Sequence, residues 1–279
     1  GNSGTRPAPL PFGMSKNGLV VFCVMAGITL VFFAGMAYRR NLVWRSEETL
    51  WLDVIQKSPH KARGHNNLGA VYLEKKRYAE AIEEYRKAIA LEPNHHNAHV
   101  NLSFALATLQ RPEEAIAMAD RALQIKPDSP AAYHALGKAY LAKGDLAEAL
   151  RYYEKAVQAA PDYVEAHYDW GNALARQERF GEAIPHFEAV LAARPENLSV
   201  RANLAIALLE VGRLGEAIFQ AEETVRRNPR FPLGHLALGK SLLRAGKSEQ
   251  GREQLKQVLQ SDPGNVEARL LLRQSSQDP

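Results

Sequence analysis

One segment of the chain, Gly234–Ser241, has the sequence GHLALGKS and matches the GxxxxGK[ST] pattern of phosphate-binding loops. Such a loop binds phosphate through backbone N–H groups that converge at a turn between a strand and a helix. Here the match falls in a segment with helical periodicity, where those N–H groups are already bonded to carbonyls four residues earlier. We therefore predict no nucleotide site.

Histidines could hold a metal ion near the middle of the chain. His95, His96 and His99 cluster, and His95 and His99 have the i, i+4 spacing of two ligands on one helix face. No acidic general base lies between them, and no third ligand can be identified elsewhere. His99 also recurs at 68-residue intervals as His167 and His235, which is typical of a packing position. The prediction is a structural role, with no metal and no cofactor.

Acid–base and nucleophilic chemistry find equally little support. The paired carboxylates Glu83-Glu84, Glu113-Glu114 and Glu222-Glu223 need a pocket that separates their pKa values before they can act as acid and base. Lys or Arg lies three to four residues away, as in Glu83 and Lys87, which indicates a solvated helix face. Cys23 is the single cysteine and lies in an apolar run. We predict no catalytic residue in this chain, and hence that the chain is not itself an enzyme.

The net charge of +4 does not indicate nucleic-acid binding, because the excess is confined to one end. Residues 1–45 hold five basic and no acidic residues, whereas residues 46–279 have a net charge of −1. The larger part therefore has no excess charge to neutralise phosphates.

The basic end contains an uncharged run of 20 residues, 18–37 (GLVVFCVMAGITLVFFAGMA). A helix of this length spans about 30 Å, the thickness of a bilayer hydrocarbon core. Tyr38 and Trp44 suit the membrane interface, and Arg39 and Arg40 end the run with charges that lipid excludes. We predict a single transmembrane helix; a cleavable signal peptide, with Gly35-Met36-Ala37 as its cleavage site, and a buried core helix remain alternatives.

Prolines fall at positions 59, 93, 127, 161, 195, 229 and 263, a constant step of 34 residues. In this frame we predict six repeats, 62–95, 96–129, 130–163, 164–197, 198–231 and 232–265. The eighth and twentieth residues of each repeat are Gly, Ala or Ser throughout, which lets two antiparallel helices approach closely. Each repeat is therefore expected to form a helical hairpin, and stacked hairpins bury a continuous core.

Segments outside the repeats complete the expected organisation. Residues 1–17 are a Pro/Gly-rich loop of the kind that joins domains, so the chain is also interpreted as the tail of a longer protein. Residues 38–61 form a juxtamembrane segment with a lone capping helix over 47–57. Residues 266–279 form a C-terminal cap helix and tail, with Glu267, Arg269 and Arg273 on its polar side.

Two strings, AHVNLSFALATLQRPEEAIAMADRALQIKP and AYHALGKAYLAKGDLAEALRYYEKAVQAAP, resemble the tetratricopeptide repeat. The resemblance covers residues 62–265 and implies an all-α fold, a right-handed superhelix of helical hairpins after one transmembrane helix. Departures are mild: Ser103 and Ala205 replace the usual glycine, and Gly251, Thr224 and Val258 replace alanine.

The junction over residues 38–72 (YRRNLVWRSEETLWLDVIQKSPHKARGHNNLGAVY) is similar to that of polytopic membrane glycosyltransferases bearing C-terminal tetratricopeptide repeats, including transmembrane O-mannosyltransferases. The resemblance implies that the catalytic part would lie upstream of this chain. No catalytic residue of that family can be carried over.

In the repeat family, positions two, five, nine, twelve and thirteen of the first helices line a concave groove. The resemblance implies that an extended peptide or a protein partner binds this groove, whose surface is partly polar and partly apolar. Together with an asparagine at position six, the expected groove residues are Asn66, Asn101, Phe104, His134, Lys138, Tyr168, Asn172, Ile206 and Lys240.

These features predict a membrane-anchored scaffold that binds proteins or peptides; the alternative is the acceptor-recruiting region of a membrane glycosyltransferase, and a secreted solenoid is the third. Arg39, Arg40 and Arg45 after the helix outnumber Arg6 and Lys16 before it, which favours cytoplasmic repeats. The glycosyltransferase resemblance implies extracytoplasmic repeats, and we favour that side.

Overall fold

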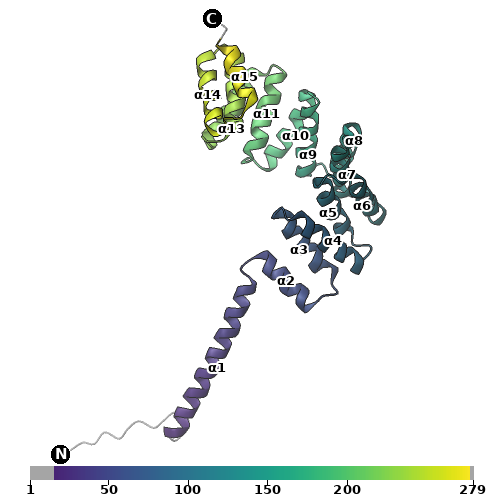
Figure 1. The fold of residues 1–279 in the computed structure, drawn as a ribbon, viewed down its shortest axis with the longest axis vertical. Helices are drawn as coiled ribbons and strands as arrows, with labels where there is room; N and C mark the ends of the chain where they lie inside the picture. Colours follow the sequence, from purple (N-terminus) through teal and green to yellow (C-terminus); the bar gives the residue numbers. More distant parts are fainter. Residues whose placement is uncertain (1–15, 277–279) are drawn as a thin grey trace, which may run out of the picture. The chain divides into compact units, whose positions relative to one another are not determined.

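The structure is a computed structural model that describes residues 16–276, without the side chains of residue 16 and residues 39–43. All regular structure in this part of the chain is helical, with fifteen helices and no strand (Figure 1). The all-α prediction is confirmed. The helices fall into two compact units that divide after Pro93.

The first unit begins with α1 (Lys16–Val43), which includes the predicted apolar run and extends beyond both of its ends. The window Asn17–Tyr38 is long and apolar enough to cross a membrane, and none of it is buried against the described chain. Tyr38 and Trp44 are exposed. Residues 1–15 of the predicted loop and the side chains of Arg39 and Arg40 lie outside the described residues.

Three further helices complete this unit: α2 (Glu47–Lys57), α3 (Ala62–Glu74) and α4 (Tyr78–Leu91). Ser46 begins α2 with a capping box, because its hydroxyl accepts from the Thr49 amide and its own amide donates to the Thr49 hydroxyl. Glu48 then receives hydrogen bonds from Lys75 at 2.6 Å and Arg77 at 2.7 Å, which lower the pKa of its carboxyl. The lone helix is thereby tied to the turn of the first hairpin.

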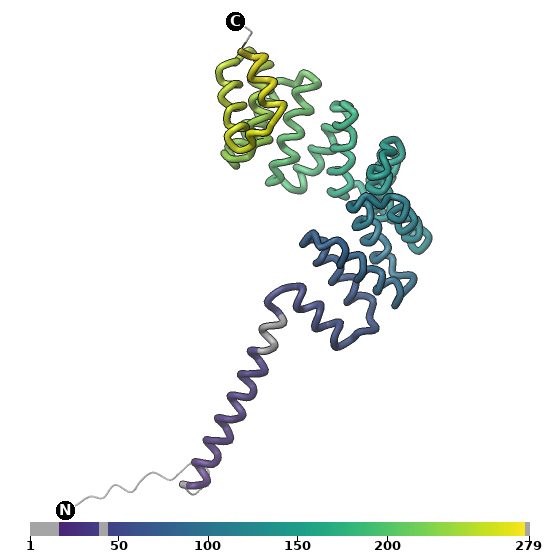
Figure 2. Tube along the Cα trace, in the orientation of Figure 1, coloured from purple at the N-terminus to yellow at the C-terminus, as the bar shows by residue number. Residues whose placement is uncertain are grey.

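The second unit contains five helical hairpins and a final helix. Its first helices are α5 (His96–Thr108), α7 (Pro130–Lys143), α9 (Val164–Arg176), α11 (Leu198–Glu210) and α13 (Pro232–Arg244). Its second helices are α6 (Pro112–Ile125), α8 (Leu146–Ala159), α10 (Phe180–Ala193), α12 (Leu214–Arg227) and α14 (Ser248–Ser261), and α15 (Val266–Ser275) follows. Figure 2 traces these hairpins one after another along the chain. Every first helix begins at residue one of a 34-residue frame and every second helix at residue seventeen.

Small residues at the eighth frame position bring the two helices of a hairpin into contact. A Cβ atom built on Gly137 would stand 2.4 Å from the ring of Tyr153, which is fully buried. Ser103 replaces glycine at this position in α5 without loss, because its buried hydroxyl donates to the Ala115 carbonyl at 2.7 Å. The hairpin therefore accepts serine at this position in α5, where its hydroxyl is bonded across the pair.

The turn inside each of the six hairpins has a left-handed residue at frame position fifteen. Three of them are the expected glycines, including Gly144 at φ 84°. The other three are Lys76, Gln110 and Glu178, at φ 57° to 59°. The same backbone turn is thus formed where the sequence offers no glycine.

In four of the repeats, the side chain at frame position four bonds two partners: the backbone carbonyl of the preceding proline and a side chain of the second helix. Its outer nitrogen donates to the carbonyl of the proline six residues earlier, as in His167 to Pro161 at 3.0 Å and Arg201 to Pro195 at 2.8 Å. Its other nitrogen bonds a residue of the second helix 19 residues later, such as Gln220. We call this arrangement the clasp; its members are His65, His167, Arg201 and His235.

Candidate peptide-binding groove

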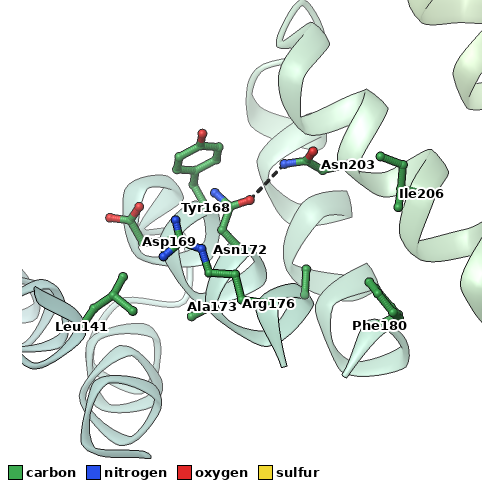
Figure 3. Close-up of a pocket in the computed structure, with 10 residues that line it drawn as sticks. Leu141, Tyr168, Asp169, Asn172, Ala173, Arg176, Phe180, Asn203 and Ile206 are labelled. Atoms are coloured by element: carbon green, nitrogen blue, oxygen red, sulfur yellow. Dashed lines mark hydrogen bonds between the residues drawn. The ribbon is translucent and has the colours of Figure 1, made fainter. Parts of the chain in front are cut away.

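An open cavity of ≈ 580 Å³ lies between α7, α9 and α11 in the second unit (Figure 3). Its lining combines apolar side chains with a few polar ones, as ligand sites generally do. The lining residues are Leu141, Tyr168, Asp169, Asn172, Ala173, Ala175, Arg176, Phe180, Asn203 and Ile206. Three residues expected in the groove, Tyr168, Asn172 and Ile206, are among them.

An amide pair crosses this cavity from one repeat to the next. The Asn203 amide nitrogen donates to the Asn172 side-chain oxygen at 3.0 Å, the dashed bond in Figure 3. Each amide has two N–H donors and one oxygen acceptor, so N–H donors and an amide oxygen remain for a ligand whichever way the pair is oriented. Tyr168 stands beside the pair with 36% of its surface exposed. A backbone amide unit of an extended peptide has the complementary groups.

His134 was expected to face the groove, but its side chain is buried. It contacts the groove indirectly, through a hydrogen bond to the lining residue Asp169. Its Nε2 donates to Asp169 at 2.7 Å, so its Nδ1 accepts from the Tyr163 hydroxyl at 3.1 Å. Lys138 also donates to Asp169 at 3.2 Å. Burial acts to raise the pKa of the Asp169 carboxyl, but His134 and Lys138 outweigh it and hold that pKa below its ordinary value.

Aromatic rings extend the same buried wall. The Phe104 ring meets the edge of His134 with centroids 5.1 Å apart, and Tyr163 meets it at 5.2 Å. Burial raises the pKa of the Tyr163 hydroxyl to about 12, so it remains a proton donor at neutral pH. Phe104 is therefore part of the wall that positions His134 and Asp169.

The remaining expected residues lie outside this cavity. Lys240 lines a second cavity of ≈ 290 Å³ with α15 and pairs with Glu267 at 2.8 Å and Glu210 at 3.6 Å. Asn66 belongs to the first unit and is buried, with its amide bonded to Asn67 at 3.1 Å. Asn101 is partly buried in α5.

Trp170 lies in α9, the helix that carries Tyr168 and Asn172, and was not among the residues expected at the site. The other five repeats carry leucine at this frame position, so the departure from the column was the available signal. Its indole stacks on His186 with ring centroids 4.0 Å apart. His186 donates from Nδ1 to Nδ1 of His167, whose Nε2 donates to the Pro161 carbonyl. Burial and the neighbouring imidazole lower the pKa of His186 to about 4.

The motifs weighed for catalysis have structural places. Gly234–Ser241 lies within α13, where Gly239 packs against Leu255 and Gly234 against Thr224. His95 caps α5 by accepting from the Ala98 amide at 3.2 Å. Across residues 16–276, no three His, Cys, Asp or Glu side chains gather in a way that could hold a metal ion.

Family models described as tetratricopeptide repeat match residues 53–139 and, further along, 134–184, 168–231 and 236–272. The chain belongs to the tetratricopeptide repeat family. Such an array is a scaffold suited to protein interaction, because stacked repeats present extended concave surfaces.

Two curated relatives share a short segment with these tetratricopeptide repeats. Protein O-mannosyl-transferase TMTC1 of mouse is 31% identical over 83 residues, and its human counterpart is 30% identical over 82 residues. The segment covers 30% and 29% of this chain, respectively, and 9% of either relative's length.

Solved structures share the fold of this repeat chain. A chain of the APC/C hetero-tetramer Cut9–Hcn1 superposes with a TM-score of 0.69 at 18% identity, covering 81% of this chain and 45% of that one. PilF of Pseudomonas aeruginosa gives 0.66 at 18%, covering 76% and 97%. YrrB, described as having an unusual peptide-binding site, gives 0.59 at 22%, covering 68% and 97%.

Proposed function

We propose that this chain is a membrane-anchored tetratricopeptide repeat scaffold whose cavity between α7, α9 and α11 binds an extended segment of a protein partner. The amide pair Asn172–Asn203 carries the proposal, because it offers both N–H donors and an oxygen acceptor beside the exposed ring of Tyr168. Rigid aromatic rings anchor bound segments at low entropic cost. The description of YrrB as a peptide-binding repeat protein supports the same class of ligand.

The test is selection of peptides from a random display library on the full chain in lipid nanodiscs. Selected peptides should bind the double variant Tyr168→Ala/Phe104→Ala at least tenfold more weakly than the wild type, because Tyr168 presents the exposed ring of the cavity and Phe104 packs on His134 in the wall behind it. Phe219→Ala is the matched control, because Phe219 is exposed on α12 and does not line the cavity. Unchanged binding by the double variant would remove these rings from the site.

The membrane anchor of the proposal is α1, supported by its length, its apolar composition and its exposure. We favour extracytoplasmic repeats, because the junction over residues 38–72 resembles that of membrane glycosyltransferases with C-terminal repeats, and a segment of this chain is 31% identical to Protein O-mannosyl-transferase TMTC1 of mouse. Ser261 is exposed at the end of α14 and can carry a cysteine in a Cys23→Ser background. Labelling of intact cells by an impermeant maleimide supports the outside, and labelling only after lysis contradicts it.

A second candidate function is that these repeats recruit acceptors for a membrane O-mannosyltransferase. The 31% identity to TMTC1 favours it, although that match involves only a short segment of the relative. An antibody raised against the repeats would report the mass of the native protein in its membrane. A band near 30.9 kDa would reject this candidate, whereas one of about twice that mass or more would support it.

A further inference from the structure

The cavity contains a guanidinium without an ion-pair partner. Arg176 is exposed at the end of α9 and lines the cavity, and no hydrogen bond or salt bridge joins its guanidinium to another residue of the described chain. The arginines at the hairpin turns differ, because each pairs with a glutamate three residues later. Four such arginines occupy frame position sixteen, namely Arg77, Arg111, Arg179 and Arg213.

Charge within the cavity is positive once its internal pairs are counted. Asp169 and Arg176 are the charged residues of the lining. The carboxylate of Asp169 is already neutralised by Lys138 at 3.2 Å and hydrogen-bonded by His134 at 2.7 Å. Arg176 therefore retains an uncompensated charge beside the amide pair, and Figure 3 draws its guanidinium between Asp169 and Asn172.

We propose that the groove selects extended segments that carry an aspartate or glutamate side chain, and that Arg176 receives this carboxylate. The inference rests on the proposed function and names the chemistry of its ligand. A guanidinium binds a carboxylate through two parallel N–H···O bonds, which a lysine ammonium cannot reproduce. The amide pair holds the backbone of the segment, while Arg176 reads one side chain.

An arginine at the same frame position lines the second cavity, two repeats later. Arg244 occupies frame position thirteen of α13, as Arg176 does in α9, and lines the ≈ 290 Å³ cavity beside α15. It too has no ion-pair partner in the described chain, whereas Lys240 in that cavity is held by Glu210 and Glu267.

The experiment repeats the display selection in nanodiscs with wild type, Arg176→Gln and Arg179→Gln. Arg179→Gln is the control, because it removes an arginine of the same hairpin that is paired with Glu182 at 2.8 Å and does not line the cavity. Wild type and control should both enrich acidic residues at one position of the peptide, and Arg176→Gln should lose that enrichment. Replacing the selected glutamate by glutamine should weaken binding to wild type about tenfold and leave binding to Arg176→Gln unchanged.

Peptide binding and acidic preference can fail separately. If peptides are enriched without acidic preference, or if Arg176→Gln keeps the preference, Arg176 does not read the ligand and the inference fails while peptide binding stands. If no peptide is enriched above empty nanodiscs, the proposed function fails and the inference fails with it. Partial retention of affinity by Arg176→Lys would support a charge contribution, and full retention would reject the bidentate geometry.

Discussion

Substituting Gly137 by alanine tests how closely the helices of a hairpin approach. The added Cβ would stand 2.4 Å from both Cδ1 and Cε1 of the Tyr153 ring, where ordinary contact begins at 3.4 Å. The ring must therefore move by roughly 1 Å, yet Tyr153 has no exposed surface. Overpacking of this kind costs about 1–3 kcal/mol, and alanine recovers up to about 1 kcal/mol of helix propensity.

Because the neighbour is a fully buried ring rather than the end of a flexible side chain, we expect the cost near the top of its range. The net loss in the free energy of unfolding is then about 2 kcal/mol for Gly137→Ala. Displacement of the ring should also reach the groove, since Tyr153 and His134 have centroids 5.9 Å apart. Peptide affinity should fall along with stability.

The measurement is urea unfolding of the full chain in nanodiscs, followed by circular dichroism. Gly215→Ala is the matched control, because its Cβ meets nothing within 4 Å in α12 and the substitution should stabilise the protein by about 0.5 kcal/mol. The two alanines thus have opposite expected signs. An unfolding midpoint for Gly137→Ala equal to or above that of the wild type would refute the packing argument.

Three other predictions concern stability. Glu178→Gly should raise the free energy of unfolding by about 1 kcal/mol, because φ is 58° there, and a thermal midpoint at or below wild type would contradict this. Stability should fall as pH drops from 6.5 to about 4, by about 1–2 kcal/mol, since the unfolded chain protonates at the His186 position before the folded chain does. His186→Gln should flatten this part of the pH profile of the unfolding midpoint. Asp169→Asn should lower stability by about 1–2 kcal/mol at neutral pH. The difference should vanish at acidic pH, because wild-type Asp169 is then protonated and its lowered pKa no longer stabilises the fold. A difference in stability that does not depend on pH would reject this reasoning.

The repeat architecture could be read from the sequence because it depends on local spacing. A proline every 34 residues and small residues at two fixed positions determine where each helix begins and how closely a pair packs. The glycine-rich string in α13 is also explained locally. Gly234 leaves room for Thr224, which is larger than the alanine usual at its own position, because a Cβ on Gly234 would stand 2.8 Å from the Thr224 methyl.

The site was less predictable, because it depends on partners one repeat away. His134 has the frame position of a groove residue, but Asp169 and Tyr163, 35 and 29 residues later, hold it inside. Periodicity places a side chain on a helix face and does not reveal whether a neighbouring repeat covers it. Arg176 could have been found from the sequence, since its position is among those expected to face the groove.

The clasp changes where one repeat ends and the next begins. Its side chains reach back six residues to a proline carbonyl that precedes the helix start, as His235 does to Pro229 at 2.9 Å. A segment that begins at the first residue of a helix would contain the side-chain donor but not the proline carbonyl that accepts from it. The exchangeable module of this array therefore runs from proline to proline, and grafts or deletions made at prolines should preserve a connection that cuts at helix boundaries sever.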